Sequence, residues 1–277
     1  MPQPDSGPDL ENGKLKLFQV DAFTSRLFQG NPAAVCPLTD WLPDALMQAI
    51  AAENNLSETA FFIGGDGRYR LRWFTPACEV RLCGHATLAT AFVLWERLGE
   101  PSAAIQFDTL SGRLTASKRD SWIQLDFPLL NSRPVEPPER LVQSLQVQPS
   151  EYLYAGESED SGNYVAVYPD EQTVRSLKPD LARLAGMEGQ GLAVTAPGLD
   201  CDFVSRYFVP SFGVDEDPVT GSTHCILAPL WAARLGKTDL FARQVSPRGG
   251  ELRCSVAGSR VLLSGQACLY LEGWIRI

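Results

Sequence analysis

Short runs in which apolar and polar residues alternate dominate the first half of the chain. Alternation with a period of two residues is typical of strands that bury one face. A helical period occurs only at Pro43–Glu53, which we expect to form an amphipathic helix. The strands predicted in this half are Leu15–Val20, Ser57–Ile63, Tyr69–Phe74, Ala104–Asp108, Arg113–Ser117 and Trp122–Asp126.

Two segments depart from this alternation because they are apolar on every side. Gly84–Gly99 has no charged residue until Glu96 and Arg97, and a helix of this kind must be buried all round. Ser222–Leu235 has a similar pattern, although Pro229 removes a backbone hydrogen bond and should kink the helix. Apolar helices among many short strands predict an α+β fold in which a sheet wraps around a central helix, once in each half of the chain.

The two halves repeat four short motifs in the same order. The second copies follow the first at separations of 132, 134, 137 and 138 residues, close to half the chain length. Chance similarity between common turns and strands is the alternative, but four matches in register favour a tandem duplication. The motif pairs begin at Gly30 and Gly162, Arg72 and Arg206, Gly84 and Gly221, and Gly112 and Gly250.

A proline-rich segment separates the halves. Leu125–Arg140 contains four prolines, each of which fixes φ and lacks an N–H donor, so we expect an interdomain connection here. The predicted organisation is a flexible tail at residues 1–14, an N-terminal repeat domain at 15–130 and a C-terminal repeat domain at 131–277. Residues 267–277 extend past the repeat as a strand that could pair within its own half or return to the first domain.

Composition and charge exclude several classes of function. The 277 residues carry a net charge of −9, whereas nucleic acids and anionic membranes require a basic surface. The seven cysteines include no Cys-x-x-Cys pair and there are two histidines, which disfavours zinc and thioredoxin-type sites. No apolar run reaches the ~18 residues of a membrane helix, and the N-terminus lacks the apolar region of a signal peptide. We therefore expect a reduced, cytoplasmic protein.

Each apolar helix starts at a glycine that follows a loop, at Cys83–His85 and at Asp217–Ser222. Helix N-termini bind anions such as carboxylates because their N–H groups are unpaired and carry partial positive charge. Two such ends facing each other across a cleft between the domains would hold a small anionic substrate. Ordinary capping is the alternative, since Thr220 and Ser222 suit an N-cap and Asp217 suits a turn.

Both histidines fall in the first turns of these helices. His85 directly follows Gly84, so it is the better candidate for contact with a ligand. His224 is interpreted as a structural histidine that hydrogen-bonds to a backbone carbonyl. Cys83 could be a thiolate, because a helix N-terminus lowers the pKa of a thiol, or it could be a small buried hydrophobe.

Glu58 is the candidate general base. It lies in Leu56–Phe62, where strand alternation would place it on the same face as Ala60 and Phe62. A carboxylate on an apolar face is costly to bury unless it is paired, and a desolvated carboxylate is suited to moving protons. The alternative places Glu58 at the end of a strand, in water.

Seven short motifs are distributed along nearly the whole chain from Leu15 onward, and they follow one another in a fixed order. They are Asp21–Thr24, Phe28–Pro32, Asn55–Phe61, Phe74–Pro76 with Glu79, Cys83–Thr87, Asp217–Ser222 and Arg248–Glu251. This series resembles the phenazine-biosynthesis isomerase (PhzF) family. It is most similar to the phenazine-biosynthesis-like proteins of organisms that make no phenazines.

The resemblance implies a diaminopimelate-epimerase-like fold, with two similar domains, each a β-barrel-like sheet around a central helix, and a site between them. It implies isomerisation of a small cyclic carboxylic acid by proton transfer, without a metal or an organic cofactor, in a homodimer. Glu58 is then the catalytic acid and base. The residues that would bind and polarise the substrate are Gly84, His85, Asp217, Gly221 and Ser222.

Two alternative functions remain open. An epimerase or racemase would use Cys83 with Asp217 or Glu58 as the opposite base. Thiol-dependent racemases of this fold use one cysteine from each half, and the second loop offers Pro218 instead, which disfavours a two-thiol enzyme. A non-catalytic, protein-binding descendant would keep the cleft without turnover, although the intact Glu58 argues against it.

Overall fold

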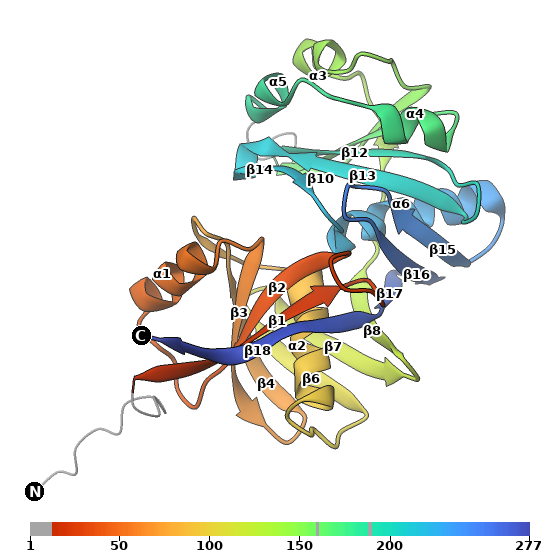
Figure 1. The fold of residues 1–277 in the computed structure, drawn as a ribbon. Helices are drawn as coiled ribbons and strands as arrows, with labels where there is room; N and C mark the ends of the chain where they lie inside the picture. Colours follow the sequence, from red (N-terminus) through yellow and green to blue (C-terminus); the bar gives the residue numbers. More distant parts are fainter. Residues whose placement is uncertain (1–12, 159–160, 188–189) are drawn as a thin grey trace, which may run out of the picture. The chain divides into compact units, whose positions relative to one another are not determined.

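A computed structural model describes residues 13–158, 161–187 and 190–277, which form two compact units (Figure 1). Unit 1 takes in the described residues up to Phe28, then Pro32–Leu125 and Gln266–Ile277; unit 2 takes in Gln29–Asn31 and Asp126–Gly265. Of the predicted tail at residues 1–14, residues 1–12 lie outside the described chain, and Lys14 already belongs to the first strand.

The division after Leu125 comes earlier than the predicted boundary at residue 130. The connection is held by unit 2, because the N–H groups of Leu129 and Leu130 donate to the carbonyl oxygens of Ser259 and Cys225, at 2.9 and 3.1 Å.

Both units are mixtures of strands and helices. The elements of unit 1 are β1 (Lys14–Ala22), β2 (Asn31–Pro37), α1 (Asp44–Asn54), β3 (Glu58–Gly65), β4 (Arg68–Phe74), β5 (Glu79–Val80), α2 (Gly84–Glu96), β6 (Ala104–Thr109), β7 (Gly112–Arg119), β8 (Trp122–Pro128) and β18 (Ala267–Arg276). The elements of unit 2 are β9 (Arg133–Pro134), α3 (Glu139–Ser144), β10 (Glu151–Ser158), β11 (Ser161–Val167), α4 (Glu171–Ser176), α5 (Leu181–Ala185), β12 (Gln190–Pro197), β13 (Phe203–Val209), the 3₁₀ turn η1 (Pro210–Phe212), β14 (Val214–Asp217), α6 (Gly221–Leu235), β15 (Asp239–Gln244), β16 (Gly250–Ala257) and β17 (Arg260–Gly265). β2 begins, and β8 ends, with residues that are grouped with unit 2.

The six strands and the amphipathic helix predicted for the first half are confirmed, with ends that differ by a few residues. β2 was not among the predicted strands. Its sequence NPAAVCP has a proline near each end and no alternation, and five of its seven residues are buried. A continuous buried run of this kind is typical of a strand covered on both faces, which has no period-two signal.

Parallel and antiparallel pairings follow each other in the same order in both units. β2–β3 and β4–β6 are parallel, whereas β3–β4 and β6–β7 are antiparallel. In unit 2, β11–β12 and β13–β15 are parallel, whereas β12–β13 and β15–β16 are antiparallel. Parallel neighbours need a crossover connection, and α2 and α6 supply it at equivalent places. The four repeated motif pairs fall on β2 and β11, β4 and β13, α2 and α6, and β7 and β16.

One strand of the second half belongs to unit 1. β9, the first strand of unit 2 after the connection, pairs with β10 of the same unit. β18 follows β17 but pairs antiparallel with β1 of unit 1, from Lys14 opposite Arg276 to Ala22 opposite Ala267. The terminal strand, for which the sequence left two partners open, therefore completes the first unit (Figure 1).

The central helix α2 is enclosed as its sequence predicts. All of its residues except Phe92 and Glu96 are buried, and it packs against β1, β3, β7 and β18. Its two interior threonines satisfy their hydroxyl groups within the helix, because Thr87 and Thr90 donate to carbonyl oxygens four residues earlier at 2.6 and 2.7 Å. Within the described residues, no helix is long and apolar enough to cross a bilayer.

The second central helix, α6, contains Pro229 in its interior. Proline has no N–H group, so it cannot donate to the Cys225 carbonyl four residues earlier. The Leu130 N–H donates to that carbonyl oxygen instead, at 3.1 Å. The proline inside the helix thus leaves a carbonyl oxygen free to bind the connection between the halves.

His224 is a structural residue, in agreement with the interpretation of the sequence. Its ring is fully buried, Nδ1 lies 2.8 Å from the carbonyl oxygen of Thr220, and the ring packs against Phe203. Burial lowers the pKa of His224 to about 4, although the carbonyl partner opposes this effect. The imidazole is therefore neutral near pH 7, with its Nδ1–H donating to Thr220.

This burial predicts a stability that falls as the pH drops from about 6.5 to about 4. In that range the unfolded chain takes up a proton at His224 and the folded chain does not, so protonation favours unfolding. A pKa depressed to this extent corresponds to about 3 kcal/mol. Urea unfolding between pH 4 and pH 7 should give the wild-type protein a slope that is steeper than that of His224→Gln by up to about 1.4 kcal/mol per pH unit. An equal slope in both proteins would contradict the assignment.

Candidate functional site

Three candidate residues of unit 1 lie together at the start of α2. Glu58 is the first residue of β3, Cys83 is the N-cap of α2, and His85 is the second residue of that helix. His85 Nε2 lies 3.1 Å from Glu58 Oε2, and His85 Nδ1 lies 3.5 Å from Cys83 Sγ. The imidazole therefore bridges a carboxylate and a thiol.

The position of Glu58 combines the two alternatives considered from the sequence. It stands at the end of a strand, yet its side chain is only 18% exposed, and its partner His85 is 6% exposed. A largely shielded carboxylate is tolerated when it is paired with a positive charge. The geometry therefore gives Glu58 a partner on its inner side and leaves the other side partly open.

Burial and charge have opposite effects on the two partners of this carboxylate. Burial disfavours the protonated form of His85, but Cys83 and Glu58 outweigh it and raise the pKa of His85 well above its usual value. Burial raises the pKa of the Cys83 thiol to about 11, with the charge of Glu58 adding to the rise and His85 opposing it. The Cys83 thiol is therefore neutral near pH 7, so at that pH Glu58 is the neighbour whose charge favours the protonated imidazole.

Cys83 is buried, and desolvation is the largest cause of its raised pKa, which favours the small buried hydrophobe of the two possibilities. As the N-cap, Cys83 makes no side-chain capping hydrogen bond to the described residues. Gly84, the first residue of α2, is buried. The N-terminal amides of α2 consequently lack a capping side chain from their own N-cap, which favours an anion as their partner.

The candidate residues of unit 2 surround the start of α6. Asp217 is the last residue of β14 and Thr220 is the N-cap of the helix. One oxygen of Asp217 accepts a hydrogen bond from Asn31 Nδ2 at 2.8 Å, and the other accepts from the Thr220 hydroxyl. Asn31 Nδ2 also donates to the Val219 carbonyl oxygen, at 2.9 Å. Asp217 is therefore a fixed, hydrogen-bonded carboxylate.

The loop that carries Asp217 is held at several further points. Gln244 Oε1 accepts from the Thr220 N–H at 2.8 Å, and its Nε2 donates to the Asp217 carbonyl oxygen at 2.7 Å. Ser246 Oγ donates to the Pro218 carbonyl oxygen at 2.7 Å. These contacts fix the backbone on both sides of the loop, so the position of Asp217 is set before any ligand arrives.

The other two predicted residues of unit 2 open the helix itself. Gly221 is its buried first residue and Ser222 its exposed second residue. Because the Thr220 hydroxyl binds Asp217, it makes no capping hydrogen bond to the helix within the described chain. Thr220 is also the counterpart of Cys83, since both are N-caps; the assignment of Pro218 to that place was wrong, and the absence of a second thiol at the N-cap stands.

The structure thus brings Glu58, Cys83, Gly84 and His85 together in unit 1, and Asp217, Gly221 and Ser222 in unit 2. The expectation that the two helix starts face each other stays a prediction. Sequence reasoning missed the roles of Asn31, Gln244 and Ser246. Asn31 lies within a motif that was noted, but no pattern marks Gln244 or Ser246, which act through the fold.

Glu58, Cys83 and His85 are also the group of described residues that could hold a metal ion, since one donor atom from each lies within 4.8 Å of the others. Carboxylate, thiolate and imidazole are all zinc ligands. The two ring nitrogens of His85, however, each face a different neighbour, and one ion can bind only one of them. The arrangement is better described as a histidine that forms an ion pair with Glu58 and contacts the thiol of Cys83.

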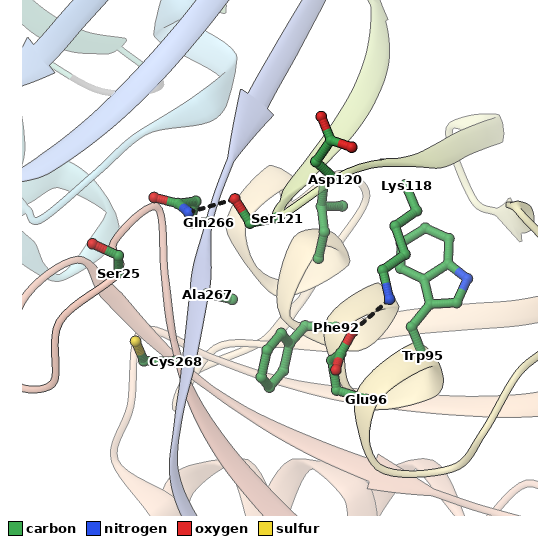
Figure 2. A pocket seen from close by; sticks show the side chains of 11 residues that line it. Ser25, Phe92, Trp95, Glu96, Lys118, Asp120, Ser121, Gln266, Ala267 and Cys268 are labelled. Atoms are coloured by element: carbon green, nitrogen blue, oxygen red, sulfur yellow. Dashed lines mark hydrogen bonds and ion pairs between the residues drawn. The ribbon is translucent and has the colours of Figure 1, made fainter.

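A cavity of about 270 Å³ lies elsewhere in unit 1, beside the C-terminal part of α2 (Figure 2). Its lining includes none of the predicted site residues. Two pairs of its polar side chains bind each other: Lys118 Nζ lies 2.6 Å from Glu96 Oε1, and Gln266 Nε2 donates to Ser121 Oγ at 3.0 Å.

Comparison with known proteins yields relatives along nearly the whole chain. The profile of the phenazine biosynthesis-like protein family matches residues 20–273. An uncharacterised isomerase of Pseudomonas aeruginosa is 52% identical over 264 residues, which make up 95% of this chain and 100% of the relative. A crystal structure of a PhzF-family phenazine biosynthesis protein from Enterococcus faecalis has a TM-score of 0.90 and 43% identity, covering 95% of this chain and 100% of that chain.

More distant structures share the fold alone. A probable proline racemase from Agrobacterium radiobacter has a TM-score of 0.59 at 13% identity, covering 95% of this chain and 92% of that chain. The family match and the near relatives agree with the motifs at the two helix starts. The chain belongs to the phenazine biosynthesis-like (PhzF) family and is an enzyme of the isomerase class.

Proposed function

We propose that the enzyme moves a proton on a small carboxylic acid and that Glu58 is the general base and acid. The observation that carries this proposal is the 3.1 Å contact between Glu58 Oε2 and His85 Nε2, in a group that is largely shielded from water. A positioned carboxylate that is partly open on one side can accept a proton from a substrate carbon and return it at another.

His85 contributes by its charge. The imidazole lies 3.1 Å from Glu58 and its positive charge holds the carboxylate in place. The proton that Glu58 accepts from one substrate atom is then returned to another. Such a cycle isomerises a substrate without net consumption of any reagent.

The helix starts supply the binding groups in this proposal. The first-turn N–H groups at Gly84 and at Gly221 and Ser222 suit a carboxylate or the negative charge of an enol-like intermediate. Asp217 is an acceptor, so it suits a hydroxyl or amino group of the substrate and not its carboxylate. We therefore propose a substrate with one carboxylate and a hydrogen-bond donor nearby.

The proposal retains the finer features of the resemblance. Each unit would be one copy of a duplicated plan, a sheet wrapped around a central helix. The substrate would contact residues of both units, and the protein would be a homodimer. No metal and no organic cofactor take part in the proposed proton transfer. Light scattering of the purified protein tests the dimer, which requires twice the mass of one chain.

Glu58→Gln should abolish proton transfer, since the amide keeps the shape of the side chain and cannot act as a base. A thermal-shift screen of small carboxylic acids identifies ligands, because one at a hundred times its dissociation constant stabilises by about 2.7 kcal/mol. Incorporation of solvent deuterium into such a ligand is then measured by mass spectrometry. We expect the exchange rate to fall by roughly 10³-fold or more. General bases typically contribute about 10²–10⁴-fold, so this loss exceeds the lower end of that range.

The matched control is Glu53→Gln, the same chemical change at an exposed position of α1. It should leave both the thermal shift and the exchange rate unchanged. Deuterium incorporation by Glu58→Gln at the wild-type rate would remove Glu58 from the mechanism.

The thiol-dependent alternative makes a different prediction for Cys83. With its pKa raised to about 11, the thiol should react slowly with iodoacetamide at pH 7, and its rate should rise about tenfold per pH unit up to pH 10. Peptide mass spectrometry follows this reaction, with the exposed Cys78 as an internal reference. Cys83→Ser should retain deuterium exchange; rapid alkylation at pH 7 together with an inactive serine variant would favour the epimerase.

A further inference from the structure

Each unit contains an equivalent arginine–glutamate ion pair that lies outside the groups described so far. In unit 1, Arg72 of β4 binds Glu79 of β5 with two parallel contacts, Nε to Oε1 at 2.7 Å and Nη2 to Oε2 at 2.8 Å. In unit 2, Arg206 of β13 binds Glu216 of β14 in the same way, with both contacts at 2.8 Å. Two-pronged contacts of this kind fix orientation as well as distance.

The third nitrogen of each arginine extends this correspondence. Arg72 Nη1 donates to Asp44 Oδ1 at 2.9 Å, at the first residue of α1. Arg206 Nη1 donates to the carbonyl oxygens of Val174 and Leu177 at 3.1 and 2.7 Å, at the end of α4. α1 and α4 occupy equivalent crossovers, between β2 and β3 and between β11 and β12. Each arginine thus joins a crossover helix to two strands.

Each glutamate lies the same number of residues before the N-cap of a central helix. Glu79 precedes the N-cap Cys83 by four residues (83 − 79), and Glu216 precedes the N-cap Thr220 by four (220 − 216). The strands that carry them are short: β5 pairs with β4 over two residues, and β14 pairs with β13 over three. A strand with so few paired residues is held only weakly by the sheet. The two parallel contacts between arginine and glutamate supply the missing constraint.

Both pairs are sheltered enough to act in this way. The four side chains are between 10% and 25% exposed, whereas surface pairs open to water contribute little. The pKa of Arg72 is raised, first by its hydrogen bonds with Glu79, although burial opposes this effect. Each arginine also lies over an aromatic ring of its own strand, Phe74 or Phe208.

We propose that the pairs Arg72–Glu79 and Arg206–Glu216 are positioning residues, each of which sets the loop leading into one central helix. The first pair would place Cys83 and His85 against Glu58, and the second would place Asp217 and Thr220. The catalytic consequence rests on the proposed function, whereas the positioning itself does not. The two can therefore be tested separately.

Two histidines make the positioning measurable without any substrate, because each lies in the first turn of one helix. His85 touches Glu58 and Cys83, and His224 Nδ1 bonds to the carbonyl of Thr220. In ¹⁵N-histidine-labelled full-length protein, Glu79→Gln should shift the imidazole signals of His85 and leave those of His224 in place. Glu216→Gln should do the reverse.

Glu96→Gln and Glu151→Gln are the matched controls. They remove the same charge from exposed ion pairs, with Lys118 in unit 1 and with Arg234 in unit 2. Both histidines should keep their wild-type signals in both controls. The proposal is overturned if the test variants shift their histidines no more than these controls do, or if each test variant shifts both histidines alike, which would indicate general loosening of the fold.

The catalytic consequence has its own readout. With a ligand from the carboxylic-acid screen, Glu79→Gln should lower the rate of deuterium exchange by roughly 10- to 100-fold through misplacement of His85 and Glu58. Glu216→Gln should mainly raise KM, since Asp217 is a binding group. Selective histidine shifts without any exchange in the wild-type protein would uphold the positioning and refute the proposed function. Unselective shifts with normal wild-type exchange would do the opposite.

Discussion

The burial of one apolar helix in each unit, α2 along nearly its whole length and α6 mainly from Gly221 to Ala228, is the constraint on which the rest of the structure depends. A helix without a polar face has no side that can contact water, so strands must cover its flanks. Polar atoms along its length must be satisfied internally, as the threonines of α2 are. The N–H groups at its start cannot be satisfied in this way, because the helix offers them no acceptors. The candidate residues Glu58, His85 and Asp217 lie at or near the places where the central helices begin.

The two starts share a scaffold and differ in their polar groups. Cys83 and Thr220 are both N-caps, and His85 and Ser222 are both second residues of their helices. In unit 1 the histidine pairs with Glu58, which stays partly exposed. In unit 2 the carboxylate of Asp217 is engaged by Asn31 and Thr220. A duplicated frame with divergent ends suits a division of labour, with proton transfer at one end and recognition at the other.

The sequence alone predicts the elements and the repeat, because strand alternation and all-round apolarity are local patterns. It also singles out Glu58 and His85 as candidates, through their position in a strand and next to a helix glycine, and the structure places the two side chains 3.1 Å apart. It does not predict β2, whose continuous burial removes the period-two signal. Nor does it reveal Gln244 and Ser246, which reach the Asp217 loop from 24 or more positions along the chain and have no spacing of their own. The forked arginines lie in a repeated motif, but their glutamates become visible only when the strands are paired.

The return of the C-terminal strand to the first unit has a consequence for the synthesis of the chain. β1 pairs along its length with β18, so contacts such as Lys16 with Glu272 join residues 256 positions apart. Contacts so distant in sequence form late, because a long loop must close first. During synthesis, the first half therefore leaves the ribosome with one edge of β1 unpaired, and it waits in that state until the final strand emerges. Exposed strand edges are sites of aggregation, so β1 carries this risk until β18 has been synthesised and can pair with it.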